Sequence, residues 1–132
     1  MNTGNEQVIR GLVIDESFTG DAVPVALKRY AVRTYPFHLN GAPIHITELR
    51  LPEDVCPAAL LEIAEALAPE RYYAHFVRDD TLYVIFPGVI CSIKQGHATA
   101  MRIAKMIGCE FRIPVEQMPF EGLFTDDHPG GA

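Results

Sequence analysis

One stretch constrains the fold of this chain more than any other. Residues 72–96 read YYAHFVRDDTLYVIFPGVICSIKQG, and apolar side chains occupy most of these positions. Arg78-Asp79-Asp80-Thr81 separates two apolar runs, and Asp favours turns because its carboxylate bonds to nearby backbone. Pro87-Gly88 interrupts the second run, either as a tight turn or as a bend within one long strand. We favour the turn because proline cannot donate to a central ladder, and we therefore predict three strands, near 72–77, 82–86 and 89–94.

The apolar pattern of these strands predicts the middle of a sheet. Side chains alternate along a strand, so Ala74 and Phe76 point to one face and Tyr73 and His75 to the other. Residues 82–86 are apolar at every position, so both faces of that strand need cover. Helices would cover one face, and the N-terminal hairpin or a second subunit would cover the other. Closed two-fold pairing is a common solution for such a sheet, and we predict a homodimer.

The remaining elements follow from hydrophobic periodicity and turn residues. Strands are expected at 8–15 and 44–51, and helices at 57–68 and 97–107. A last short strand is expected at 109–113, followed by a helical turn that begins at Pro114. Gly108 is expected to end the second helix, since glycine adopts positive φ without strain.

The segment 25–35 is ambiguous. It alternates like a strand but also contains helix-favouring residues. Pro24 and Pro36 bracket it, and the residue before a proline favours extended backbone, so we predict a strand. Asn40-Gly41 follows as a strong hairpin signal.

This order of elements predicts an α+β fold, a mainly antiparallel sheet with two helices on one face. From about residue 44 the order β-α-β-β-α-β matches a split β-α-β sandwich, to which an N-terminal hairpin is added. The length suits a single domain over residues 1–132. The ends, 1–7 and 125–132, are expected to be flexible.

Composition argues against several classes of function. A net charge of −6 disfavours nonspecific nucleic-acid binding, which depends on Lys and Arg. No apolar run reaches the length of a transmembrane helix, so no membrane partner is expected. The start lacks the pattern of a secretory signal, and we expect a cytoplasmic protein. Cys56, Cys91 and Cys109 form no CxxC pair and are interpreted as structural thiols, with Cys56 the one to test for reactivity.

The histidines supply the candidates for acid–base chemistry. His38 and His45 flank the Asn-Gly turn, and Glu48 lies three residues beyond. Two imidazoles and a carboxylate suit zinc, iron or proton transfer, but positions 45 and 48 point to opposite faces of a strand and the spacing matches no metal motif. His75 lies in the apolar stretch, and Tyr73 beside it would serve as a donor. His45, Glu48, His75 and Tyr73 are the catalytic candidates, and neither a metal nor another cofactor is expected.

A second candidate site precedes the second predicted helix. Gly96 and His97 stand at its N-terminus, where unpaired N–H groups attract anions, and Lys94 comes just before them. Lys94, Gly96 and His97, with Tyr83 on the neighbouring strand, are therefore the candidates for holding a small ligand or anion.

These patterns favour binding over catalysis. The sequence contains neither a nucleophile elbow nor a glycine-rich phosphate loop. We expect a small soluble noncatalytic module that binds a small ligand or a partner protein as a homodimer. The alternative is a small isomerase, lyase or hydrolase with a His/Glu/Tyr pocket, which requires at least two of the candidates to converge.

Overall fold

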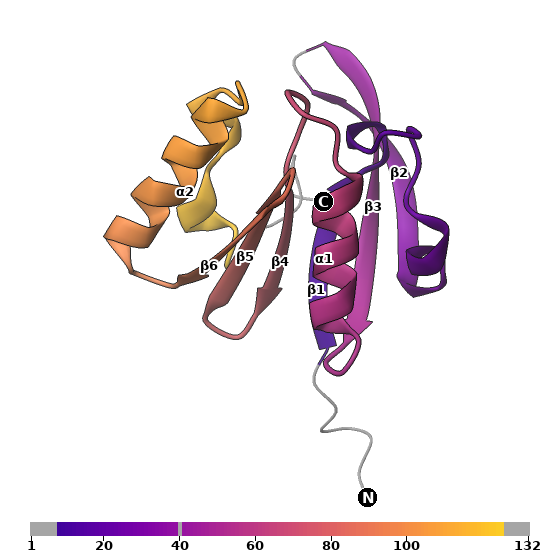
Figure 1. The fold of residues 1–132 in the computed structure, drawn as a ribbon, viewed down its shortest axis with the longest axis horizontal. Helices are drawn as coiled ribbons and strands as arrows, with labels where there is room; N and C mark the ends of the chain where they lie inside the picture. Colours follow the sequence, from indigo (N-terminus) through magenta and orange to yellow (C-terminus); the bar gives the residue numbers. More distant parts are fainter. Residues whose placement is uncertain (1–7, 40, 126–132) are drawn as a thin grey trace, which may run out of the picture.

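Six antiparallel strands form one sheet (Figure 1). The computed structural model describes residues 8–39 and 41–125. The strands are β1 (Val8–Ile14), β2 (Ala31–Leu39), β3 (Ala42–Pro52), β4 (Ala74–Arg78), β5 (Thr81–Phe86) and β6 (Val89–Lys94). They are ordered β2-β3-β1-β4-β5-β6, and each neighbouring pair is antiparallel. The predicted α+β class with an antiparallel sheet is confirmed.

The centre of the sheet contains a split β-α-β unit. Because β1 is antiparallel to both β3 and β4, those two strands run parallel to each other with β1 between them. The helix α1 (Cys56–Ala66) connects them. The N-terminal strand thus fills the gap of the split unit rather than decorating the sheet from outside.

The three strands predicted in residues 72–96 are present as β4, β5 and β6. Asp79 and Gly88 adopt φ values of 54° and 75° in the two connecting turns. Glycine tolerates such a value freely, which explains the Pro87-Gly88 turn. The Gly88 N–H donates to the Ala64 carbonyl at 3.0 Å, so the tip of the β5–β6 hairpin is tied to the end of α1.

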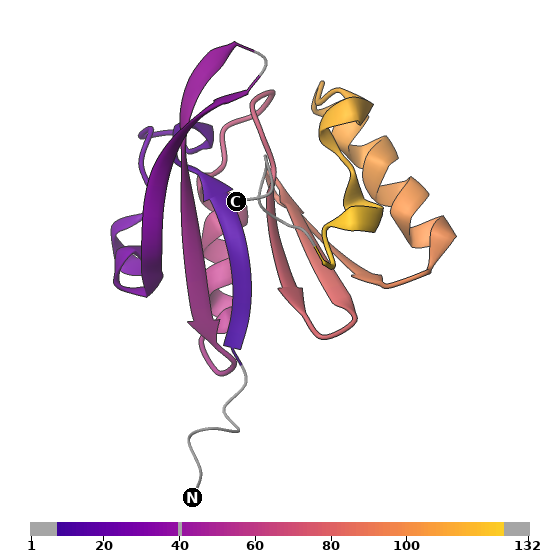
Figure 2. The same ribbon diagram turned by 180° about the vertical axis from the view of Figure 1, so that it is seen from behind.

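The structure departs from the prediction in the placement of the two helices, which lie on opposite faces. Phe76 and Ile85 are buried together with α1, whereas Leu82, Val84 and Phe86 are buried with α2 (Ala98–Glu110). Figure 1 shows α1 in front of β1 and β3, and Figure 2 shows it behind them. The uniformly apolar β5 requires cover on both faces, and α2 rather than the N-terminal hairpin or a second subunit covers the second face.

Residues 25–35 do not form one strand. Val25–Tyr30 is a 3-10 helix, η3, and β2 begins at Ala31 and continues through Pro36. Proline is tolerated there because β2 is an edge strand. The predicted hairpin is confirmed by the pairing of Leu39 with Ala42, with Gly41 at φ 83°; Asn40 lies outside the described residues.

The predicted strand at 109–113 is also absent, because α2 continues to Glu110 and a turn follows. Arg112 adopts φ 63°, and the Ile113 N–H returns to the Gly108 carbonyl at 3.0 Å, which is a Schellman-type ending. Gly108 therefore does not stop the helix by its own φ. It is buried where a Cβ would overlap the Met118 sulfur, so close packing requires glycine there.

The C-terminal segment completes the core on the α2 side. Two short 3-10 turns, η4 (Val115–Gln117) and η5 (Phe120–Gly122), follow α2, and Phe120 is fully buried. The predicted helical turn after Pro114 is thereby confirmed. The predicted flexible ends lie outside the described residues, apart from Thr125. Within residues 8–39 and 41–125, no helix has the length and apolar character needed to cross a membrane.

Candidate functional site

The catalytic candidates are divided between the two faces of the sheet. His45 and Glu48 point to opposite faces of β3, as the spacing predicts. The exposed His45 ring meets Glu16 of η2 (Asp15–Ser17), with 2.7 Å between Nδ1 and Oε2. The backbone N–H of His45 donates to Oε1 of the same carboxylate at 2.8 Å. His45 is thus a surface partner of Glu16 and does not meet the other candidates, while His38 is its diagonal neighbour across the β2–β3 hairpin.

Glu48 and His75 share the other face. Leu12 of β1 pairs with Glu48 on one side and with His75 on the other, which places the two candidates two strands apart. Glu48 is buried, and its carboxylate accepts from Arg50 Nε at 2.9 Å and from Arg33 Nε at 3.4 Å. These ion pairs give the Glu48 carboxylate a structural role that joins β2 to β3.

Tyr73 and His75 are the two catalytic candidates that come into contact, with ring centroids 6.3 Å apart. The Tyr73 hydroxyl donates to the Gln117 carbonyl at 2.7 Å, and its ring packs edge-on against Phe120 at 5.3 Å. Burial raises the pKa of the Tyr73 phenol far above its ordinary value. The phenol therefore anchors η4 to the sheet and stays neutral.

The predicted anion site is occupied by the protein's own groups. His97 is the N-cap of α2, and its Nδ1 accepts from the Ala100 N–H at 3.2 Å, so the helix begins one residue later than predicted. Lys94 Nζ lies 3.4 Å from Asp80 Oδ1, and Gly96 takes φ 84° in the turn between β6 and α2. Tyr83 shares a face with Lys94 on the β5–β6 hairpin.

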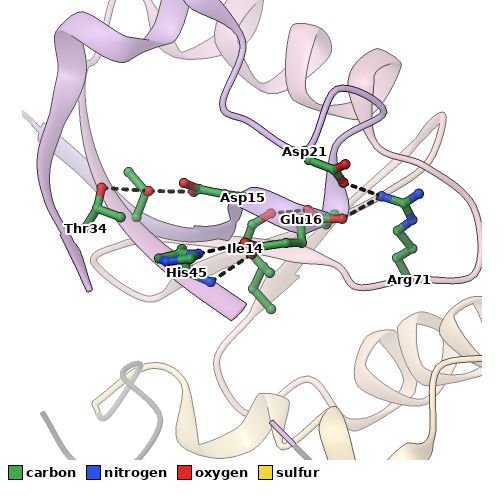
Figure 3. A network of polar contacts seen from close by, with 9 residues as sticks. Ile14, Asp15, Glu16, Asp21, Thr34, His45 and Arg71 are labelled. Carbon is green, nitrogen blue, oxygen red and sulfur yellow. Dashed lines mark hydrogen bonds and ion pairs between the residues drawn. The ribbon is translucent and has the colours of Figure 1, made fainter. Parts of the chain in front are cut away.

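A polar network that sequence reasoning missed joins η2 to β2 and β3 (Figure 3). Thr47 Oγ1 donates to Asp15 Oδ1 at 2.6 Å and lies 2.9 Å from Thr34 Oγ1. Burial raises the pKa of the Asp15 carboxyl, against the hydrogen bond from Thr47. Partial burial also acts on Glu16, but hydrogen bonds from His45 prevail and lower its pKa, while the bond to Glu16 raises the pKa of His45.

Next to this network lies an open depression of about 400 Å³. Its lining residues come from η2, the loops beside it and the C-terminal segment: Glu16, Asp21, Glu70, Arg71, Tyr72, Pro114 and Gln117. Arg71 Nη1 donates to the Glu16 carbonyl at 2.7 Å and to Asp21 Oδ1 at 3.0 Å (Figure 3). Three carboxylates against one guanidinium give the depression an acidic rim. In the described part of the chain, no cluster of His, Cys, Asp or Glu has the arrangement to hold a metal.

The outer side of β6 is the second feature that sequence reasoning missed. β6 is a terminal strand of the sheet, and Ile90 on it is 41% exposed. On α2, which packs beside β6, Ile103 is 48% and Met106 62% exposed. We call the outer side of β6 together with these α2 residues the β6 edge surface. The sequence does show that Ile103 and Met106 lie off the helical stripe of buried α2 residues. It does not show that β6 is an edge strand, because that depends on strand order.

Comparison of the chain with models of protein families, with curated proteins and with solved structures finds no match to any of them.

Proposed function

We propose that this protein is a noncatalytic binding module that accepts another polypeptide chain at the β6 edge surface by strand addition. In this mode an extended segment pairs with an exposed sheet edge, and backbone hydrogen bonds supply much of the affinity. The observation that carries the proposal is the exposed, unprotected outer edge of β6, beside the exposed apolar residues of α2.

The hydrogen-bond pattern of the β5–β6 hairpin, which decides which β6 backbone groups point outward, supports the proposal. The Gln95 N–H donates to the Asp80 carbonyl at 2.8 Å, so these two residues form a hydrogen-bonded pair. Hydrogen-bonded and non-hydrogen-bonded pairs alternate along an antiparallel ladder, so every second residue before Gln95 bonds to β5. Val89, Cys91 and Ile93 therefore bond inward to β5. Ile90 and Ser92 present their N–H and C=O groups outward, and no other described strand pairs with that edge.

The orientation of α2 also supports it. Lys105 bonds to Glu121 of η5 at 2.9 Å, which directs that flank of α2 toward the C-terminal segment. Ile103, two residues earlier, lies on nearly the opposite side of a 3.6-residue helix. Figure 1 shows the C-terminal segment beside α2, and the exposed Ile103 lies on the flank of α2 away from Lys105.

The enzyme alternative has weaker support. It rests on the ring contact between Tyr73 and His75, with Glu48 on the same face. However, the phenol already donates to Gln117 and the carboxylate lies between two arginines, so each has a structural partner. A small ligand at Lys94, Gly96, His97 and Tyr83, as expected from the sequence, has weaker support too, because His97 caps α2 and Lys94 pairs with Asp80.

Peptide titration tests strand addition directly. The probe is a soluble synthetic peptide of alternating Thr and Val flanked by lysines, added to dilute ¹⁵N-labelled protein. We expect the amide protons of Ile90 and Ser92 to shift and to exchange more slowly, with Val32 on β2 as the control position. Unchanged exchange at Ile90 and Ser92, at every peptide and protein concentration, would overturn the proposed function.

A further inference from the structure

Resting on the proposed function, we infer that the chain bound at the β6 edge surface is a second copy of this protein, paired antiparallel about a two-fold axis at Cys91. A two-fold axis uses the same surface patch on both subunits, so the patch must be complementary to itself. Three properties of the β6 edge surface meet this condition.

The first property is register. In an antiparallel pair, residues directly opposite one another point to the same face of the sheet. Centring the axis on Cys91 puts Ile90 opposite the partner's Ser92, and these are the residues whose backbone groups point outward. Each such pair exchanges two backbone hydrogen bonds. Val89 then lies opposite the partner's Ile93, so the row on the α2 face is apolar throughout.

One hydrogen bond favours Cys91 over Ser92 as the centre. Centring on Ser92 would pair Ile90 with the partner's Lys94, whose carbonyl already accepts from the His97 N–H at 3.0 Å. When the axis is centred on Cys91, Ile90 and Ser92 exchange the backbone hydrogen bonds between the two copies instead. It also places the two Lys94 side chains at opposite ends of the seam, where like charges stay apart.

The second property is charge. The protein carries a net charge of −6, which makes copies repel, yet residues 81–109 contain no Asp or Glu. This acid-free segment builds β5, β6 and nearly all of α2. Its cations are Lys94, Lys105 and Arg102, of which Lys94 pairs with Asp80 and Lys105 with Glu121. The β6 edge surface is thus a region where two copies can meet without opposing acidic groups.

The third property is the apolar flank of α2. A single extended peptide would satisfy the β6 backbone but would cover less of Ile103 and Met106 than a partner with its own helix. A two-fold axis perpendicular to the sheet puts both copies of α2 on the same face, one on each side of the β6–β6 pairing. A partner that brings its own helix therefore fits the exposed residues better than an isolated strand.

The test combines mass measurement with cross-linking. Sedimentation equilibrium should give twice the chain mass at micromolar concentration. Ile103→Lys, which leaves β6 unchanged, and Ser92→Pro, which removes an outward N–H, should each weaken the dimer at least tenfold. A chain that is monomeric at every concentration overturns this inference. If that monomer still binds the Thr-Val peptide at Ile90 and Ser92, the proposed function survives without it.

Cross-linking tests the register. Opposite Cα atoms in a non-hydrogen-bonded antiparallel pair lie about 4.5 Å apart, within the range that disulfides span. In a Cys109→Ser background, where Cys56 is buried, oxidation with diamide should therefore link Cys91 to the partner's Cys91. Two matched variants lacking Cys91 and Cys109 carry Ser92→Cys on β6 or Val32→Cys on β2. Faster linkage through either variant would contradict the Cys91-centred seam.

Discussion

The two ends of the sheet differ in both their edges and their chemistry. At the β2 end, the pairing shifts register between Ala31 and Arg33, and Pro36 takes a position where its missing N–H would face outward. Bulges, prolines and charged side chains are devices by which natural sheets hinder edge-to-edge pairing. The β6 edge, Val89–Lys94, has no bulge or proline, and its one charged residue, Lys94, stands at its end. The β2 edge thus carries features that hinder pairing with another chain, and the β6 edge lacks them, as the proposed strand addition requires.

The means of stabilisation differ in the same way. At the β2 end, a small apolar cluster around Ile44 and Ile46 is joined by polar contacts, through Glu48 with its two arginines and through the chain from Thr34 to Asp15. At the β6 end, apolar side chains of β5, β6, α2 and the C-terminal segment pack against each other. We therefore expect core substitutions to act most strongly at the β6 end and charge substitutions at the β2 end.

The largest effect should follow from Phe86→Ala. Phe86 is fully buried and stacks on Phe111, with ring centroids 5.9 Å apart. Its removal leaves a cavity under α2 and should lower the free energy of unfolding by about 3–5 kcal/mol. Urea denaturation at low protein concentration measures this, with the exposed Ile90→Ala as control. A loss below about 1 kcal/mol would mean that α2 does not pack on β5 as described.

A smaller loss is expected from Glu48→Gln at the other end. The change keeps the shape but removes the charge that two guanidinium groups share. Because Arg33 and Arg50 are about half exposed, solvent screens part of the effect, and we expect about 1–2 kcal/mol. Glu53→Gln removes a comparable but exposed partner of Arg78 and should cost less than about 0.5 kcal/mol. Equal effects of the two variants would remove the distinction we draw for Glu48.

Pro36→Thr tests the edges themselves. Threonine restores an outward N–H on β2 and favours strands, so the closed edge becomes open. We expect little change in unfolding free energy but assemblies larger than the wild type, visible by light scattering as concentration rises. An unchanged size distribution would indicate that the register shift near Arg33 suffices to close this edge.

The smallest effect concerns the His45–Glu16 pair. Glu16 has a lowered pKa, so its contribution is present above its ordinary 4.5 and is lost as pH falls through the lower folded value. His45 has a raised pKa, so its contribution is present below 6.5 and is lost as pH rises through the higher folded value. The difference in melting temperature between wild type and His45→Gln should peak between these pH values.

His38→Gln, on the same face and exposed, serves as the matched control for that comparison. The neighbouring Asp15 has a raised pKa and acts in the opposite sense to Glu16, since its burial disfavours the charged form. A difference for His45→Gln that stays constant from pH 4 to 9 would show that the pair is not ionic.

Much of the local structure can be predicted from the sequence, because turn residues and hydrophobic periodicity are local features. The strands of residues 72–96, the hairpin at Asn40-Gly41 and the helix after Glu53 all followed from turn residues and periodicity. Residues 25–30 form η3 rather than a strand, because Pro24 and Pro36 do not bracket a single element: β2 begins at Ala31 and continues through Pro36. Proline is allowed in β2 because β2 lies at an edge of the sheet, and this position depends on the tertiary structure. Glycine is likewise required at position 108 by close packing against Met118, a contact that the sequence does not reveal.

The candidate site was harder to predict for the same reason. The opposite faces of His45 and Glu48 followed from strand alternation alone. The partners of these side chains, Glu16 for His45 and two arginines for Glu48, come from segments distant in the sequence. The β6 edge surface could not be recognised without strand order, because the same residues would be buried if another strand paired with β6.

Hydrogen exchange of the backbone amides tests the central claim most directly, because it compares the two edges in one sample. We predict that the Ile90 and Ser92 amides exchange freely in dilute protein and become protected as concentration rises through the dimerisation range, while the outer amides of β2 remain unprotected. Concentration-independent exchange at Ile90 and Ser92, or protection that appears on β2 instead, would contradict the account.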